Sequence, residues 1–266
     1  MPVSRTVHAE TSYADRGSGP ALLLVHGHPF DHTMWQPQID RFSRAGHRVL
    51  APDLRGYGDS PLGASPGSTD LGVFAEDLIA LLDDLGIEEC VLAGLSMGGQ
   101  IAMELVRRHP GRVRGLVLAD TFPAAETEDG RRARNAMADR LLREGMRGYA
   151  DEVLDRMVAP HNTHAAPHVH RMMCATDPVA AAAALRGRAE RPDYRETLAA
   201  LAVPALIVVG REDTYTPVAD AEEMHALLPH STLAVIERAA HLPNLERPEE
   251  FDAALDAFLR SLVRTR

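Results

Sequence analysis

The chain of 266 residues contains no lysine, so arginine supplies all 28 of its basic side chains. Without lysine there can be no Schiff-base lysine, no serine–lysine catalytic pair and no phosphate-loop lysine. The formal net charge of −10 argues against a nucleic-acid-binding surface, which requires clustered basic residues on a basic domain. We therefore expect neither covalent amine chemistry nor a nucleic-acid partner.

Cysteine and long apolar runs are also scarce. Cys90 and Cys174 are the only cysteines, and their separation matches neither a disulfide framework nor a zinc-ligand pattern. The longest apolar runs, Ala21–Val25 and Val179–Leu185, are far too short to span a bilayer. The first residues lack the apolar core of a signal peptide. We expect a soluble protein in a reducing, cytoplasmic setting with no membrane partner, and the oligomeric state stays open.

Short apolar runs alternate with amphipathic stretches along most of the chain. The expected strands are Val3–Val7, Thr11–Ala14, Ala21–Val25, His47–Ala51, Cys90–Ala93, Val113–Ala119, Val203–Val209 and Thr232–Ile236. The expected helices are His32–Arg44, Asp70–Leu85, Met97–Arg108, Pro217–Leu228 and Glu249–Leu262. This alternation predicts an α/β fold, with a mostly parallel central sheet covered by helices on both faces.

The segment Thr121–Leu201 breaks the alternation because it has no strand signal. Its helical patterns cover Arg132–Arg143, Tyr149–Val158, Val169–Cys174 and Pro178–Ala189. We expect residues 1–120 and 202–266 to form the core and residues 121–201 to form a helical cap over one end of the sheet. The segment also holds a histidine cluster, His161, His164, His168 and His170, but Pro167 interrupts it and no glutamate stands between its members. We therefore expect no metal site there.

The most specific motif is Gly94-Leu-Ser96-Met-Gly98, which lies between an expected strand and an expected helix. A turn this sharp holds the serine in a strained backbone conformation with its hydroxyl above the sheet. The flanking glycines leave room where strand and helix crowd together, and the helix start offers free N–H groups to developing negative charge. Ser96 is the predicted nucleophile.

A second glycine-containing loop, Val25-His-Gly-His-Pro-Phe30, ends the expected strand Ala21–Val25. An N–H group from this loop would form an oxyanion hole together with the N–H of Met97. Pro29 cannot donate, so we expect His28 to supply the second donor, with Phe30 as the alternative.

Five motifs in this order resemble the α/β-hydrolase superfamily over nearly the whole chain. They are His26–Pro29, Asp53–Ser60, Gly94–Gly99, Gly210–Asp213 and Ala240–Glu246. With the run Ala183–Asp193, they are similar to 3-oxoadipate enol-lactonase-like and non-haem chloroperoxidase-like serine esterases. The resemblance implies hydrolysis of a small-molecule ester or lactone without a cofactor.

The superfamily order of nucleophile, acid and histidine implies the remaining catalytic groups. His241 follows the last expected strand and is the predicted general base. Asp120 and Asp213 both follow strands, and we favour Asp213 because it lies in a Gly-x-x-Asp turn before Pro217.

The predicted reaction is acyl transfer through an acyl-enzyme, hydrolysed by water that the histidine activates. Two other functions stay open: a cofactor-free lyase or carbon–carbon bond hydrolase using the same triad, and a non-catalytic ligand receptor on a hydrolase fold.

Overall fold

The computed structural model describes residues 1–6, 9–63 and 67–263, which leaves Val7 of the first expected strand outside the described residues. Within these ranges eight strands form one sheet in the order β1-β2-β4-β3-β5-β6-β7-β8. The strands are β1 (Val3–Arg5), β2 (Glu10–Arg16), β3 (Ala21–Val25), β4 (Arg48–Pro52), β5 (Cys90–Leu95), β6 (Val113–Ala119), β7 (Ala205–Gly210) and β8 (Ser231–Ile236). The β1–β2 and β2–β4 pairs are antiparallel and every other pair is parallel. The predicted mostly parallel sheet is confirmed.

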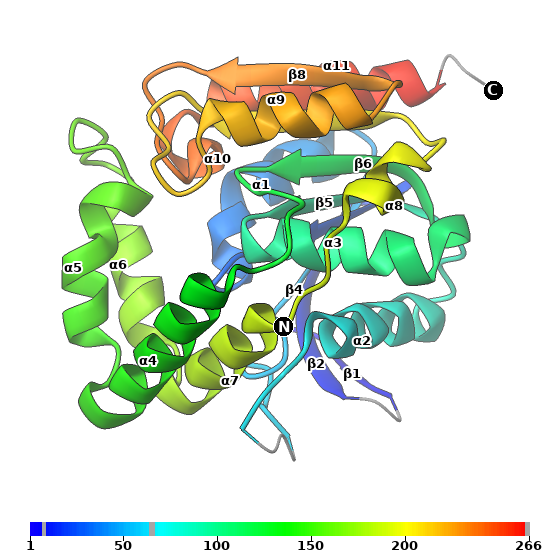
Figure 1. Cartoon of the computed structure of the whole chain (residues 1–266). Coiled ribbons are helices and arrows are strands. Elements are labelled where there is room, and N and C mark those ends of the chain that lie inside the picture. Colours follow the sequence, from blue (N-terminus) through cyan, green and yellow to red (C-terminus); the bar gives the residue numbers. More distant parts are fainter. Residues whose placement is uncertain (7–8, 64–66, 264–266) are drawn as a thin grey trace.

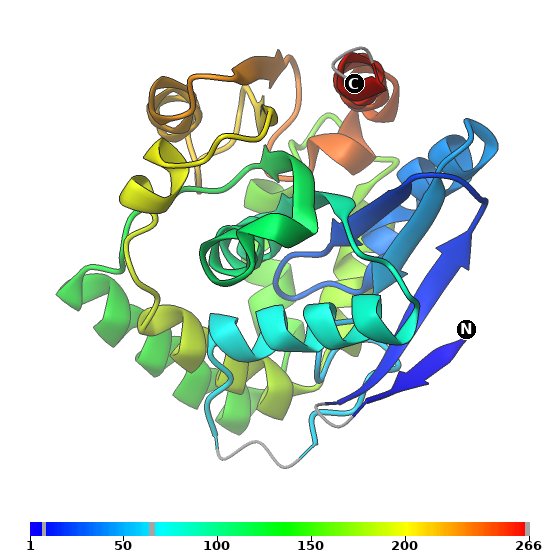
Figure 2. The ribbon, with the colours of Figure 1, turned by 90° about the vertical axis from the view of Figure 1, so that its right-hand side faces the viewer.

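Helices cover both faces of this sheet, as Figures 1 and 2 show. They are α1 (Gln36–Arg44), α2 (Leu71–Asp84), α3 (Met97–Arg108), α9 (Val218–Leu227), α10 (Pro243–Glu246) and α11 (Pro248–Val263), with 3₁₀ turns η1 (His32–Trp35) and η2 (Pro110–Arg112). Helices α2, α3 and α9 pack on one face, and α1 and α11 on the other. The central strands are therefore buried on both faces, which explains why β3 and β5 are continuous apolar runs.

Between β6 and β7 the chain is helical. It forms α4 (Glu128–Glu144), α5 (Arg147–Met157), α6 (Ala166–Ala175), α7 (Pro178–Ala189) and α8 (Arg195–Ala199). Helix α4 packs on α7 and α5 packs on α6, whereas α8 packs on α3 and α9. Figure 1 shows α5 and α6 on the side toward which the arrowheads of β6 and β8 point. Helices α5 and α6 thus lie toward the carboxyl edge of the sheet. The division into core and cap stays a prediction.

The strand order determines where a ligand site can form. After β3 the chain crosses to β4 on one side, and it later returns as β5 on the other side of β3. Val25 at the end of β3 pairs with Gly94 near the end of β5. In open α/β sheets, a crevice opens at the carboxyl ends of two strands whose connections diverge in this way. The loops that follow β3 and β5 border this crevice.

Two short helices, α8 and α10, were not predicted from the sequence. They contain five and four residues. A helix this short does not repeat its apolar positions often enough for the helical period to be recognised in the sequence. Among the described residues, no helix is both long and apolar enough to cross a membrane.

Candidate active site

Ser96 lies in the sharp turn between β5 and α3, with φ 57° and ψ −116°. A Cβ atom at Gly94 would lie 2.2 Å from the carbonyl oxygen of Gly98, and one at Gly98 would lie 2.2 Å from that of Val25. Only glycine therefore fits at either position. The backbone strain at a non-glycine residue with this φ is of the kind that folds retain at functional sites.

His241 and Asp213 meet at the carboxyl edge of the sheet, from the loops that follow β8 and β7. The imidazole Nδ1 lies 2.7 Å from Asp213 Oδ2. The backbone N–H groups of Tyr215 and Thr216 donate to Asp213 Oδ1 at 2.7 and 3.2 Å, and the Thr216 hydroxyl donates to Oδ2. Burial alone would raise the pKa of Asp213, but the charge and hydrogen bond of His241 together with these donors lower it. This carboxylate is thus ionised and oriented toward the imidazole.

Ser96 and His241 line one cavity of about 120 Å³. Its other lining residues come from the loops after β3, β6 and β7 and from helices α3, α4, α5 and α7: His28, Gln100, Thr121, Phe122, Arg134, Tyr149, Met157, Leu185, Arg188, Tyr215 and Thr216. Between these two described residues, Ser96 and His241, the structure has no hydrogen bond. Bonds of this kind are often long without substrate and shorten in the reactive complex.

The two predicted oxyanion donors lie at the same crevice. Within the described part of the chain, neither the backbone N–H of His28 nor that of Met97 has a hydrogen-bond partner. The N–H of Phe30, the alternative donor, is already used by the carbonyl oxygen of Gly27 at 3.1 Å. The oxyanion role of His28 and Met97 stays a prediction. The hydrogen bond that Phe30 N–H already makes disfavours Phe30 as the alternative donor.

The competing acid, Asp120, lies close to the same histidine but in a different environment. Its Oδ1 accepts a hydrogen bond from Gly210 N–H at 2.9 Å, and its buried Oδ2 has no hydrogen-bond partner among the described residues. Burial, followed by the charge of Asp213, raises its pKa well above the usual value. The pKa values of the two carboxyl groups are therefore shifted in opposite directions: that of Asp213 is lowered, which favours its ionised form, and that of Asp120 is raised, which favours its neutral form.

Glu246 is a functional candidate that the sequence reasoning did not single out. Its buried Oε1 accepts from the N–H groups of Ala240 and Leu242 at 2.9 and 3.1 Å, on either side of His241. Its Oε2 accepts from Ala159 N–H at 2.8 Å and Asn162 Nδ2 at 2.7 Å. One carboxylate thus fixes the histidine loop and ties it to the segment after α5.

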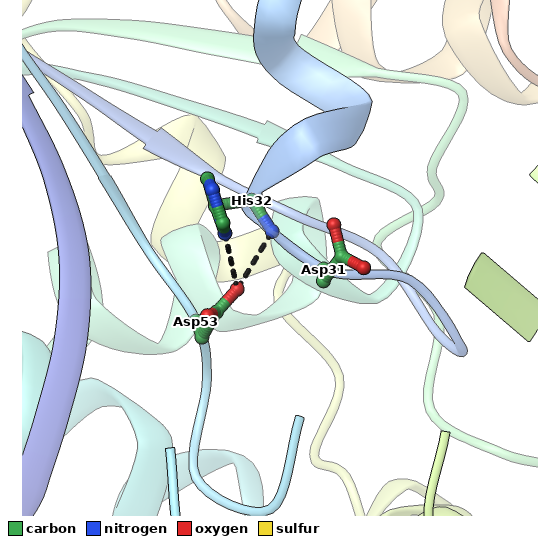
Figure 3. Close-up of side chains that lie close together, drawn as sticks. All are labelled: Asp31, His32 and Asp53. Carbon is green, nitrogen blue, oxygen red and sulfur yellow. Dashed lines mark hydrogen bonds and ion pairs between the residues drawn. The ribbon is translucent and has the colours of Figure 1, made fainter. Parts of the chain in front are cut away.

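A second group of acidic and histidine side chains is Asp31, His32 and Asp53, shown in Figure 3. Both the backbone N–H and the Nδ1 of His32 lie 2.8 Å from Asp53 Oδ1, and Asp59 N–H donates to Oδ2 at 3.0 Å. Asp31 caps η1 by accepting from the N–H and the hydroxyl of Thr33. These bonds explain the group as a structural anchor between the loops after β3 and β4.

The four histidines that lie close together in the sequence between residues 161 and 170 bond to different partners in the structure. They bond to the carbonyl oxygens of Arg238 (His161), Leu245 (His164) and Thr33 (His168) and to the carboxylate of Asp151 (His170). In residues 1–6, 9–63 and 67–263 none of the four belongs to a group that could hold a metal ion. They tie the helical segment to its neighbours.

Comparison with known proteins agrees with this architecture. The chain is 31% identical to 3-oxoadipate enol-lactonase 1 of Acinetobacter baylyi over 92% of this chain and 90% of the relative. It is 31% identical to the pimeloyl-[acyl-carrier protein] methyl ester esterase of Aliivibrio salmonicida over 92% and 94%. A thermophilic esterase from Thermogutta terrifontis, solved with malate bound, superposes with a TM-score of 0.92 at 36% identity, covering 96% and 94% of the two chains. The model of the alpha/beta hydrolase family matches residues 22–254, and the chain belongs to that family.

Proposed function

We propose that the chain is a serine hydrolase that cleaves a carboxylic ester or a lactone through an acyl-enzyme intermediate. The observation that carries the proposal is that a strained serine and a histidine line one cavity, and that an aspartate accepts a hydrogen bond from this histidine. Serine is a weak nucleophile by itself and needs an adjacent base that a third group orients. The arrangement of Ser96, His241 and Asp213 supplies all three parts.

In the proposed reaction His241 Nε2 takes the proton of the Ser96 hydroxyl as its oxygen attacks the substrate carbonyl. Asp213 accepts the hydrogen bond of Nδ1, which fixes the tautomer and stabilises the imidazolium. The N–H groups of His28 and Met97 hold the oxyanion. The histidine then protonates the leaving alcohol, and it activates a water molecule that releases the acid.

The names of the relatives agree with ester and lactone cleavage. They include an enol-lactonase, a methyl ester esterase and a thermophilic esterase. The cavity of about 120 Å³ lies well below the roughly 300–1,000 Å³ of pockets that hold drug-sized ligands, which favours a small substrate. We propose that α4–α7 act as the cap that sets this size, since Arg134, Tyr149, Met157, Leu185 and Arg188 in the cavity wall come from them.

The decisive experiment compares the wild type with Ser96→Ala on short esters and lactones, with acid and alcohol products identified. Loss of the nucleophile of a triad reduces kcat by about a million-fold, so we expect no measurable turnover. Circular dichroism should be unchanged, because the removed hydroxyl makes no hydrogen bond that the fold depends on. A Ser96→Ala variant that keeps a tenth of the activity contradicts the proposal, as does a product set other than acid and alcohol.

A further inference from the structure

Arg188 has a charge that the protein does not neutralise. It lies on α7, is 8% exposed and lines the cavity together with Ser96 and His241. Its Nε donates to Gln100 Oε1 at 3.0 Å. Among the described residues its guanidinium pairs with no carboxylate, and Nη1 and Nη2 have no acceptor. A buried cation without a partner is costly, so folds rarely keep one without a use.

The charges around Arg188 increase this cost. Arg134 on α4 and Arg191 after α7 share a single carboxylate, Glu126, which accepts from Arg191 Nη1 at 2.7 Å and from Arg134 Nε. Among the described residues, Glu126 thus pairs with Arg134 and Arg191, and no carboxylate pairs with Arg188. Burial, followed by the charges of Arg134 and Arg191, lowers the pKa of Arg188 well below its usual value. An arginine still keeps its proton at neutral pH, so this end of the cavity is positive.

The free nitrogens of Arg188 have a definite chemical preference. A guanidinium presents planar, parallel donors that match the two oxygens of a carboxylate, and such charge-assisted pairs are stronger than neutral hydrogen bonds. A bound carboxylate would also remove the cost of burying the unpaired cation. Nothing in the proposed ester-cleaving step needs this positive charge, because the oxyanion is assigned to backbone N–H groups.

We infer that Arg188 is the specificity residue of the site and binds a free carboxylate that the substrate carries in addition to its ester or lactone group. Gln100, on α3 one turn after Ser96, holds the guanidinium in place through Nε. Arg134 adds positive charge to the same wall. This inference rests on the proposed function, since it concerns the substrate of that same serine hydrolase. The substrate class is a small half-ester of a dicarboxylic acid, or a lactone that bears a carboxylate.

The test uses matched substrates that differ only in charge. Monomethyl succinate, glutarate and adipate are compared with the esters in which a primary amide replaces the free carboxylate. The readout is the ratio of kcat/KM for each acid to that for its amide. Hydrogen bonds to charged groups predict a ratio of about 10 to 100 for at least one chain length in the wild type. Arg188→Met and Arg188→Gln should bring this ratio close to one.

Arg186→Met is the matched control. It lies on the same helix but pairs with Asp139 and does not line the cavity, so its ratio should equal that of the wild type. A second measurement, inhibition of the wild-type enzyme by a dicarboxylate, does not depend on whether the variants fold. Glutarate should inhibit hydrolysis of 4-nitrophenyl acetate with a Ki at least tenfold lower than that of glutaramide.

The outcomes separate this inference from the proposed function. Wild-type ratios near one at all three chain lengths, with equal Ki values for glutarate and glutaramide, overturn the carboxylate subsite and leave ester hydrolysis intact. A ratio that survives in both Arg188 variants also overturns it. Ester cleavage that persists in Ser96→Ala overturns the proposed function and with it this inference.

Discussion

Asp120 and Asp213 follow neighbouring strands of the sheet and lie beside one histidine, yet their pKa values are shifted in opposite directions. The difference comes from their donors. Asp213 accepts from His241, from the hydroxyl of Thr216 and from two backbone N–H groups, whereas in the described part of the chain Asp120 accepts only from Gly210 N–H. Hydrogen bonds and a nearby cation favour the ionised form, and burial without them favours the neutral one. We therefore propose Asp213, rather than Asp120, as the carboxylate that stabilises the imidazolium.

The aspartates can be separated by substituting each with asparagine. Asp213→Asn removes the charge and favours the wrong histidine tautomer, which costs about ten-thousand-fold in kcat in a well-studied triad. The raised pKa of Asp120 favours its neutral form, which asparagine matches in shape, so kcat of Asp120→Asn should fall less than about tenfold. Steady-state kinetics of both variants on one ester provide the comparison. A crippled Asp120→Asn enzyme beside a nearly normal Asp213→Asn enzyme would reverse the assignment.

Among individual residues, those that belong to sequence motifs could be predicted. Residues whose role depends on partners far away in the sequence could not. The chain order named Ser96, Asp213 and His241. In the structure Ser96 and His241 line one cavity and Asp213 bonds to the imidazole, although their catalytic roles stay a proposal. Glu246 and Arg188 had no comparable signal. The importance of Glu246 comes from N–H groups as far away in the sequence as Ala159, and that of Arg188 from the lack of a counter-ion among the residues that the structure describes. Neither property is visible before the fold is known.

Among the structural elements, the loop between β8 and α10 is the one that holds His241, the proposed general base. Glu246 holds both N–H groups that flank His241, and its burial makes the four hydrogen bonds strong. The loop needs such support because it has no regular secondary structure of its own.

Glu246→Gln should impair both catalysis and stability. Each carboxylate oxygen of Glu246 accepts two hydrogen bonds, and in glutamine an NH2 group would replace one of these oxygens. That NH2 group would face two donors, so we expect a loss of about 3 kcal/mol in the free energy of unfolding. The displaced imidazole should lower kcat about 10- to 100-fold with a smaller change in KM. Urea denaturation and steady-state kinetics measure the two effects. The control is Glu249→Gln, on the exposed start of α11, which should stay within about 0.5 kcal/mol of the wild type. Normal kcat in Glu246→Gln would show that the loop needs no such support.

Glu126 connects α4 to the segment after α7, since its carboxylate accepts hydrogen bonds from Arg134 and from Arg191. Burial acts to raise the pKa of this carboxyl, but the two guanidinium groups outweigh it and lower the pKa to about 2. Its ionised form therefore adds stability that is fully present above the unfolded-state pKa near 4.5 and is lost as the pH falls toward 2.

We expect Glu126→Gln to be about 1–2 kcal/mol less stable than the wild type at pH 7, after allowance for screening by solvent. The difference should shrink as the pH falls below about 4.5. Urea denaturation of both proteins from pH 7 to pH 3 measures this. A difference that stays constant over the whole range would mean that the ion pairs contribute nothing.

The boundaries of the elements show where local sequence signals are sufficient. Helix α3 and strands β3 and β6 have the predicted limits, because polar residues, glycine, proline or the elbow motif flank each apolar run. Helix α4 begins at Glu128, earlier than the predicted Arg132. Its first turn is polar and is defined by the Thr127 cap, which accepts from Gly130 N–H at 3.0 Å, so apolar periodicity could not reveal it.

For the whole molecule, the alternation of strands and helices was sufficient to predict the fold class, and the family match confirms it. The shape of the cavity was not predictable, because its wall combines loops of the sheet with four helices far apart in the sequence. Which side chains of α4–α7 face Ser96 depends on how α4 packs on α7 and α5 on α6. A single sequence predicts the helices but not the angles at which they pack against one another.

The central claim is that Ser96 is the nucleophile, and covalent labelling tests it most directly. A fluorophosphonate reacts with a serine that a neighbouring base activates, so intact-mass spectrometry should show one adduct per chain and peptide mapping should place it on Ser96. Labelling should be absent in Ser96→Ala and strongly slowed in Asp213→Asn. An adduct on another residue, or full labelling of Ser96→Ala, would contradict the account.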